Sequence, residues 1–134
     1  MKEQERKILQ QMNDSINLDL VEMQYEYCRF DAFSDHYIVE IKNRGKYYKS
    51  TLIEFDKYTF NKEYAKIENK YFLYAVGYSP KIYIFNITDL DNNGYNYRWH
   101  WREMPRQTEF GDTGKIYKFV GYVDVEQNAR VIDT

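Results

Sequence analysis

The chain has 134 residues, of which 43% are hydrophobic and 30% are charged, with only two prolines. We expect one globular domain over residues 1–134, because this length supports a core without disulfides, and the composition excludes a disordered or low-complexity protein. The formal net charge of −2 excludes a general electrostatic attraction to nucleic acid, so any such binding must rest on a local basic surface.

Cysteine content and the amino-terminal residues set expectations about the compartment. Cys28 is the only cysteine, and no Cys/His cluster has the spacing of a zinc site. Residues 1–7 are charged, and no long apolar run follows them, so the sequence predicts neither a secretory signal nor a membrane span. We therefore expect a cytoplasmic protein.

The first third of the chain predicts a helix followed by three strands. Apolar residues recur at three- and four-residue steps over residues 2–13, as in an amphipathic helix. Asp14 and Ser15 break this pattern, and alternating residues then predict strands at about 16–22 and 25–33. A third strand, ending near residue 43, completes a hairpin with the second.

That hairpin carries the charges of most chemical interest. A turn with Ser34 and Asp35 at its tip, closed by Phe33 facing His36, would place Asp31 opposite Ile38. Because side chains alternate along a strand, Asp31 would then share one face with Glu40 and Lys42. A three-residue turn would instead move Asp31 to the other face.

Two carboxylates and an ammonium group on one face of an apolar hairpin have two interpretations. Paired acidic oxygens suit a hard cation such as Mg²⁺, and a nearby lysine can position a water molecule. Alternatively, Lys42 forms a cross-strand salt bridge with Asp31 or Glu40 on a solvated sheet face.

The remaining elements follow from helix and strand patterns. Thr51 with Glu54 has the form of a capping box, which predicts a second helix starting near Thr51. β-branched and aromatic residues predict a hairpin from strands 71–78 and 81–87. Residues 89–94 predict a loop, and strands are expected at 95–102 and 115–122.

Basic residues gather in two places. Arg44 and Lys46 follow the third strand and could hold a phosphate group, although a basic loop is commonly only solvated. In the strand 95–102, alternation places Arg98, His100 and Arg102 on one face, opposite the aromatic residues. This row is either a phosphate-facing strip or the solvent-facing side of an edge strand.

Asp31 followed by Glu40-Ile41-Lys42 resembles the Asp…Glu-x-Lys signature of the PD-(D/E)XK nuclease superfamily. Residues 37–44 resemble its small phage-encoded members, as do the carboxy-terminal segments 99–102, 105–110 and 115–122. The resemblance implies an α/β fold, in which a central mixed sheet is flanked by helices in the order helix-strand-strand-strand-helix-strand of a restriction-endonuclease-like core. It also implies a Mg²⁺-dependent nuclease acting on DNA, with Mn²⁺ able to substitute, in the host-cell cytoplasm if the chain is phage-encoded.

The same resemblance implies roles for individual residues. Asp31, Glu40 and the main-chain carbonyl of Ile41 would hold the cation, and Lys42 would position the attacking water. Glu5 lies on the inward side of the first helix, where nucleases resembling Holliday-junction resolvases carry an additional metal-binding carboxylate. Glu5 can also be a first-turn glutamate favoured by the helix dipole.

Three further residues have a weaker connection to the site. Glu54 and Tyr58 have the spacing of the Gln-x-x-x-Tyr motif of exonucleases related to the lambda and RecB nucleases, with Glu in place of Gln, and Lys57 lies close enough in sequence to reach the site.

Two alternatives to a general nuclease stay open. One is a branched-DNA resolvase, which implies a homodimer. The other is a catalytically silent nuclease-like module that binds nucleic acid or protein.

Overall fold

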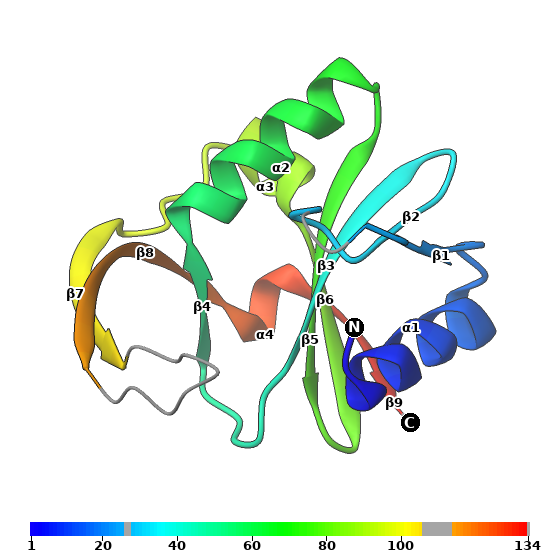
Figure 1. Cartoon of the computed structure of the whole chain (residues 1–134), viewed down its shortest axis with the longest axis horizontal. Helices are drawn as coiled ribbons and strands as arrows, with labels where there is room; N and C mark the ends of the chain where they lie inside the picture. Colours follow the sequence, from blue (N-terminus) through cyan, green and yellow to red (C-terminus); the bar gives the residue numbers. More distant parts are fainter. Residues whose placement is uncertain (26–27, 106–113, 134) are drawn as a thin grey trace.

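The computed structural model describes residues 1–25, 28–105 and 114–133. Its main element is a mixed six-stranded sheet with helices on both faces (Figure 1). Across the sheet the strands are β1 (Val21–Glu22), β2 (Ala32–Phe33), β3 (Tyr37–Asn43), β5 (Tyr71–Tyr78), β6 (Lys81–Asn86) and β9 (Ala129–Asp133). Only β3 and β5 are parallel neighbours, and α2 (Phe55–Ile67) lies between them in sequence. The expected α/β class with a central mixed sheet is confirmed.

A second, three-stranded sheet stands beside the first, and we call it the arm. Its strands are β4 (Ser50–Glu54), β8 (Lys115–Asp124) and β7 (His100–Pro105), in that order, and all are antiparallel. Figure 1 shows β7 and β8 curving away from the large sheet, while β4 runs directly into α2.

The core consists of two apolar layers, one on each face of the large sheet. The helix α1 (Glu3–Ile16) buries Ile8, Leu9 and Met12 against β3 residues such as Ile41. On the other face, α2 and the arm pack over a layer that includes Ile38, Phe72 and Tyr74. Because β3 side chains alternate, Ile41 faces α1, whereas Ile38, Glu40 and Lys42 face α2 and the arm.

The amino-terminal strands are shorter than the sequence predicts. The helix continues to Ile16, and Asn17 and Asp19 then take left-handed backbone angles, with φ of 53° and 54°. Extended pairing cannot pass through such residues, so β1 contains only Val21 and Glu22. In the predicted strand 25–33, β2 contains only Ala32 and Phe33, and residues 26–27 lie outside the described residues.

The hairpin register also differs from the prediction, by two residues. Phe33 pairs with Ile38, not with His36. The reason lies in the turn, where the Ser34 hydroxyl accepts the amide hydrogens of His36 and Tyr37 at 3.3 and 3.2 Å and so closes a longer loop. A shift of two residues preserves the side-chain faces of the paired residues, but pairing ends at Ala32 and the Asp31 amide donates to Val39, so the register does not set the face of Asp31.

The predicted capping box at Thr51 is wrong. Thr51 lies in the middle of β4, where it pairs with Val123, and only 1% of its surface is exposed. The helix α2 begins at Phe55, and its N-cap residue Glu54 makes no side-chain capping hydrogen bond. Pairing with a distant strand therefore prevails over the local helix signal.

Two later segments also depart from the predictions. Residues 89–94, expected to be a loop, fall mostly in α3 (Ile87–Asn92), which Asn86 caps by accepting the amide hydrogen of Asp89. The strand expected at 95–102 begins only at His100, because Arg98 has a φ of 57°.

The strands predicted at 71–78, 81–87 and 115–122 are confirmed to within two residues, and α4 (Val125–Asn128) precedes β9. The segment 105–110 lies largely outside the described residues. Within the described parts of the chain, no helix is long and apolar enough to cross a bilayer.

Candidate active site

The β2–β3 hairpin brings the two predicted carboxylates together. Pairing of the hairpin ends at Ala32 and Val39, with Asp31 just beyond it, and the charge of Asp31 acts on Glu40. The amide of Asp31 donates to the carbonyl of Val39 at 2.8 Å, and Oδ2 of Asp31 accepts the amide hydrogen of Ile41 at 2.7 Å. These two hydrogen bonds fix the Asp31 side chain beside β3.

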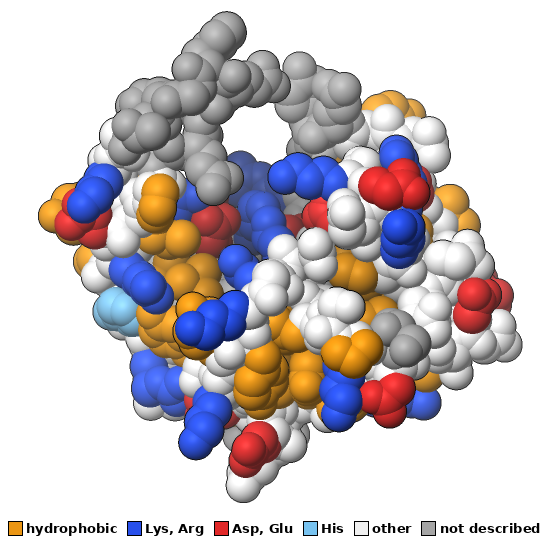
Figure 2. Space-filling model, turned by 90° about the horizontal axis from the view of Figure 1, so that it is seen from below, with side chains coloured by type: hydrophobic (Ala, Val, Ile, Leu, Met, Phe, Trp, Pro, Cys, Tyr) orange, Lys and Arg blue, Asp and Glu red, His pale blue; other side chains and the backbone are white. Residues whose placement is uncertain are grey.

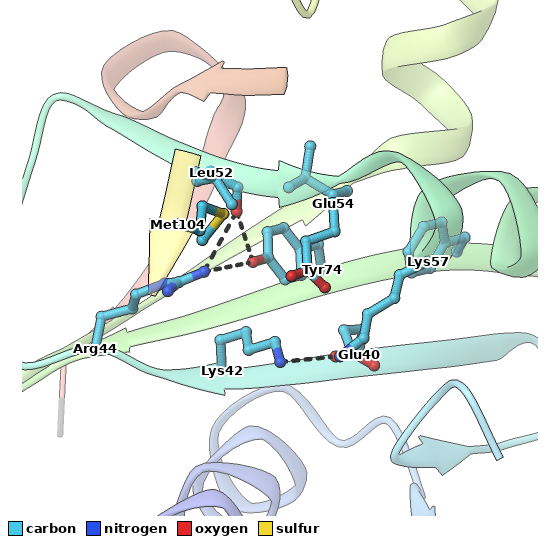
Figure 3. Close-up of a pocket in the computed structure, with 10 residues that line it drawn as sticks. Glu40, Lys42, Arg44, Leu52, Glu54, Lys57, Tyr74 and Met104 are labelled. Carbon is cyan, nitrogen blue, oxygen red and sulfur yellow. Dashed lines mark hydrogen bonds and ion pairs between the residues drawn. The ribbon is translucent and has the colours of Figure 1, made fainter. Parts of the chain in front are cut away.

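Two lysines converge on the Glu40 carboxylate, which is only 5% exposed. Its Oε1 lies 3.4 Å from Nζ of Lys42 and 3.3 Å from Nζ of Lys57. Figure 3 shows Lys42 reaching along β3 and Lys57 descending from α2 toward the same oxygen. The structure thus brings together Glu40, Lys42 and Lys57, and places Asp31 on the neighbouring strand.

The electrostatics of this cluster favour a protonated or cation-bound acid. Burial, followed by the charge of Asp31, raises the pKa of Glu40 from 4.5 to about 7, although both lysines act in the opposite direction. Burial also raises the pKa of Asp31, to which the charge of Glu5 adds, against the hydrogen bond from Ile41. Burial alone would lower the pKa of Lys42, but the charges of Glu40 and Glu54, together with hydrogen bonds to its neighbours, outweigh burial and raise that pKa.

Glu40 and Lys42 open into a cavity of about 80 Å³ between the large sheet and the arm. This volume holds a few water molecules or a small ionic group, but not a nucleobase. Its lining residues come from β3, β4, β5, β7 and α2 and are Glu40, Lys42, Arg44, Leu52, Ile53, Glu54, Lys57, Phe72, Tyr74 and Met104. Five of them belong to the large sheet or α2, four belong to the arm, and Arg44 directly follows β3, so the arm supplies only part of the wall.

Arg44 forms one end of this cavity. Its guanidinium donates to the carbonyl of Leu52 at 3.4 Å and to the Tyr74 hydroxyl at 3.3 Å, and that hydroxyl itself donates to Leu52 at 2.8 Å (Figure 3). Burial raises the pKa of Tyr74 to about 12, so its hydroxyl remains neutral. Tyr74 therefore orients Arg44 without cancelling its charge.

Glu54 lines the same cavity and forms an ion pair with Lys118 of β8, whose Nζ lies 2.6 Å from Oε1. Burial would raise the pKa of Glu54, but the hydrogen bond and charge of Lys118 outweigh it and hold that pKa below its ordinary value. Lys118 and Tyr74 are not among the residues predicted from the sequence. The one feature of the sequence that could have indicated Lys118 and Tyr74 is that each carries a polar group within an otherwise apolar strand.

Asp31 and Glu5 lie at the margin of the cluster. Asp31 borders a separate cavity of about 290 Å³ on the side of Met1 and Glu22. Glu5 is half-buried, and its carboxylate accepts the amide hydrogen of Lys2 at 3.0 Å. Glu5 thus lies in the first turn of α1 and forms a capping-box contact there, while its charge still acts on Asp31.

The other predicted residues lie outside the cavity. Tyr58 donates its hydroxyl to Asp91 at 3.0 Å, within the core beneath α2. Arg98 forms an ion pair with Asp124, and Arg102 donates to the Tyr122 hydroxyl at 2.6 Å. The ammonium of Lys46 lies 5.4 Å from the centre of the Tyr48 ring.

Among the residues that the structure describes, no group of three or more His, Cys, Asp or Glu is placed to hold one metal ion. The carboxylates that line the cavity are those of Glu40 and Glu54, and Asp31 borders the separate cavity nearby. Comparison with protein-family models and with curated protein sequences found no match to this chain.

Proposed function

We propose that this protein is a Mg²⁺-dependent nuclease that hydrolyses phosphodiester bonds of DNA. The observation that carries the proposal is the buried Glu40 carboxylate, which is close enough to Asp31 for their charges to interact and has Lys42 at 3.4 Å in a small cavity. A buried acid with a strongly raised pKa beside a second acid and a lysine is a common arrangement at catalytic centres.

The proposal includes a restriction-endonuclease-like core. Its support is the order of α1, the antiparallel β1–β2–β3 and the helix α2, followed by β5 as a parallel neighbour of β3. Strand β4 is an addition between β3 and α2, and it belongs to the arm.

The oxygen atoms of Asp31 and Glu40, with the carbonyl of Ile41, suit Mg²⁺, which binds through one or two carboxylates and keeps several waters. Burial, followed by the charge of Asp31, raises the pKa of Glu40, and a bound cation would offset both effects. When bound, Mg²⁺ would polarise a phosphate oxygen and lower the pKa of a bound water. Mn²⁺ would substitute, because it accepts the same oxygen ligands.

The lysines act on charge and position. Lys42 stays protonated, because the charge of Glu40 raises its pKa, and its ammonium group lines the cavity. From there it can hold a water molecule and offset the negative charge that develops on the phosphate. Lys57 holds Glu40 from α2 and so fixes the orientation of the carboxylate.

The first test is cleavage of single-stranded, linear duplex, circular and four-way-junction DNA by the purified protein with Mg²⁺, Mn²⁺ or chelator. We expect metal-dependent cutting, reduced about a hundredfold or more in Lys42→Ala, because an oriented charge near the phosphate is lost. Lys66→Ala, at an exposed position in the last turn of α2, is the matched control and should cut at the wild-type rate.

Cutting that resists chelator, or that Lys42→Ala leaves unchanged, would contradict the proposal. A folded wild-type protein that cuts no substrate would contradict it as well and would favour the silent binding module. Selective, paired cutting of the junction by a dimer would instead identify the resolvase alternative.

A further inference from the structure

The cavity at Glu40 adjoins a larger groove. A second hollow of about 610 Å³ shares Arg44, Leu52 and Met104 with it and lies between the β3–β4 connection and β7. The two spaces therefore lie side by side, with these residues in the wall that they share. Figure 2 shows a hollow on the underside of the molecule with Lys and Arg side chains on its walls and acidic side chains deeper inside.

The outer part of the groove is basic, in contrast to the chain as a whole. Arg44, Lys49 and Arg102 line it, and Glu103 is the one acidic residue among its described lining. The Tyr122 hydroxyl accepts a hydrogen bond from Arg102 at 2.6 Å, which holds this guanidinium at the wall. A local surplus of fixed cations attracts a polyanion even though the net charge is −2.

The groove also presents an aromatic ring. Tyr48 lines it with 58% of its surface exposed. Within the parts of the chain that the structure describes, its hydroxyl forms no hydrogen bond, and its one ring contact is the ammonium of Lys46 at 5.4 Å. A ring left open beside basic groups can stack on an unpaired base, whereas bases within a duplex are already covered by their neighbours.

We propose that this groove binds an unpaired strand of DNA, with bases on Tyr48 and phosphates on Arg44, Lys49 and Arg102. The inner cavity admits a phosphate group but no base, so the strand enters with its backbone toward Glu40 and Lys42 and its bases toward the outside. The class of ligand rests on the proposed nuclease function, and the inference adds that the substrate is single-stranded at the site.

The test measures binding separately from cleavage. Fluorescence anisotropy in chelator compares a labelled thymine oligonucleotide with the same strand annealed to its complement. We expect the single strand to bind about tenfold more tightly, and Tyr48→Ala to weaken it about tenfold while Tyr48→Phe does not, since Phe retains the stacking face. Arg102→Gln should weaken binding severalfold.

Matched controls are available on other surfaces. Tyr117 is 69% exposed on the opposite face of β8 from Lys118, and Arg130 pairs with Ile84 on the face of the large sheet that α1 covers. Tyr117→Ala and Arg130→Gln should therefore bind like wild type. Equal or tighter binding of the duplex, or losses no larger than those of the controls, would overturn the inference.

The two proposals fail differently. If the single strand binds in a Tyr48-dependent way but no substrate is cleaved, the groove proposal is supported and the nuclease proposal is contradicted. If cleavage depends on metal but neither Tyr48→Ala nor Arg102→Gln changes binding, the nuclease proposal is supported and the groove proposal is contradicted.

Discussion

Glu40 is the residue on which the site depends. Its carboxylate is nearly inaccessible to solvent, yet only one of its oxygens meets the ammonium groups of Lys42 and Lys57. Burial of a charge is unfavourable unless its partners compensate fully, and the pKa of about 7 indicates that here they do not. The folded protein therefore maintains an acid that is destabilised when ionised, as a cation-binding site requires.

This balance predicts how stability depends on pH. The unfolded chain ionises Glu40 near pH 4.5 and the folded protein near pH 7, so stability is lost as pH rises through that window, by about 3 kcal/mol. Glu40→Gln removes this contribution. In chelator, the free energy of unfolding of wild type relative to Glu40→Gln should fall by about this amount between about pH 4 and about pH 8, measured by urea denaturation.

Addition of Mg²⁺ supplies the control for that measurement. At the higher pH the cation should raise the melting temperature of wild type, because binding to the folded state stabilises it, and should leave Glu40→Gln nearly unchanged. A relative stability independent of pH, or an equal response of both proteins to Mg²⁺, would contradict the assignment of Glu40.

At the scale of elements, the sequence predicts what alternation within one or two neighbouring strands determines. Glu40 and Lys42 share a face because they are two residues apart in β3, whereas Asp31 lies beyond the last pair of the hairpin, Ala32 with Val39, so alternation does not place it. Lys118 could not be assigned to the site, because it reaches Glu54 only through the pairing of β4 with β8, whose register sets Glu54 opposite Val120. The capping box predicted at Thr51 is wrong for the same reason, since the strand that pairs with Thr51 is distant in sequence.

The arm depends on one close approach that a substitution can test. A Cβ atom at Gly121 in β8 would lie 2.8 Å from the Trp99 ring and 2.9 Å from Cβ of Tyr97, neither of which can easily move. We expect Gly121→Ala to lower the free energy of unfolding by about 1–3 kcal/mol, as overpacking does, in urea denaturation followed by tryptophan fluorescence.

Gly45 provides the comparison, because a Cβ atom there would meet nothing within 4 Å. Gly45→Ala should therefore leave stability almost unchanged. Equal stability of the two alanine variants would show that Trp99 and Tyr97 do not pack against β8 as described.

At the scale of the whole molecule, the site lies where two sheets meet. The large sheet supplies Glu40, Lys42 and Arg44, while the arm supplies Glu54, Lys118 and the outer wall at Arg102. Neither sheet alone encloses the cavity. The order of helix and strand patterns, with the resemblance, predicts the α/β class, and the local pattern predicts the hairpin. The enclosure depends on the arm, whose strand pairing joins residues far apart in the sequence.

The charge distribution over the whole molecule makes a last prediction. With a net charge of −2, only the three basic residues of the outer groove, Arg44, Lys49 and Arg102, are expected to release counterions from a bound strand. At about 0.7 per phosphate contact, the logarithm of the binding constant should fall against the logarithm of salt concentration with a slope of about −2, and Arg102→Gln should reduce the slope by about 0.7. Anisotropy titrations over a range of salt concentrations measure both. A slope twice as steep, or one that Arg102→Gln leaves unchanged, would show that the strand contacts a wider surface than the groove.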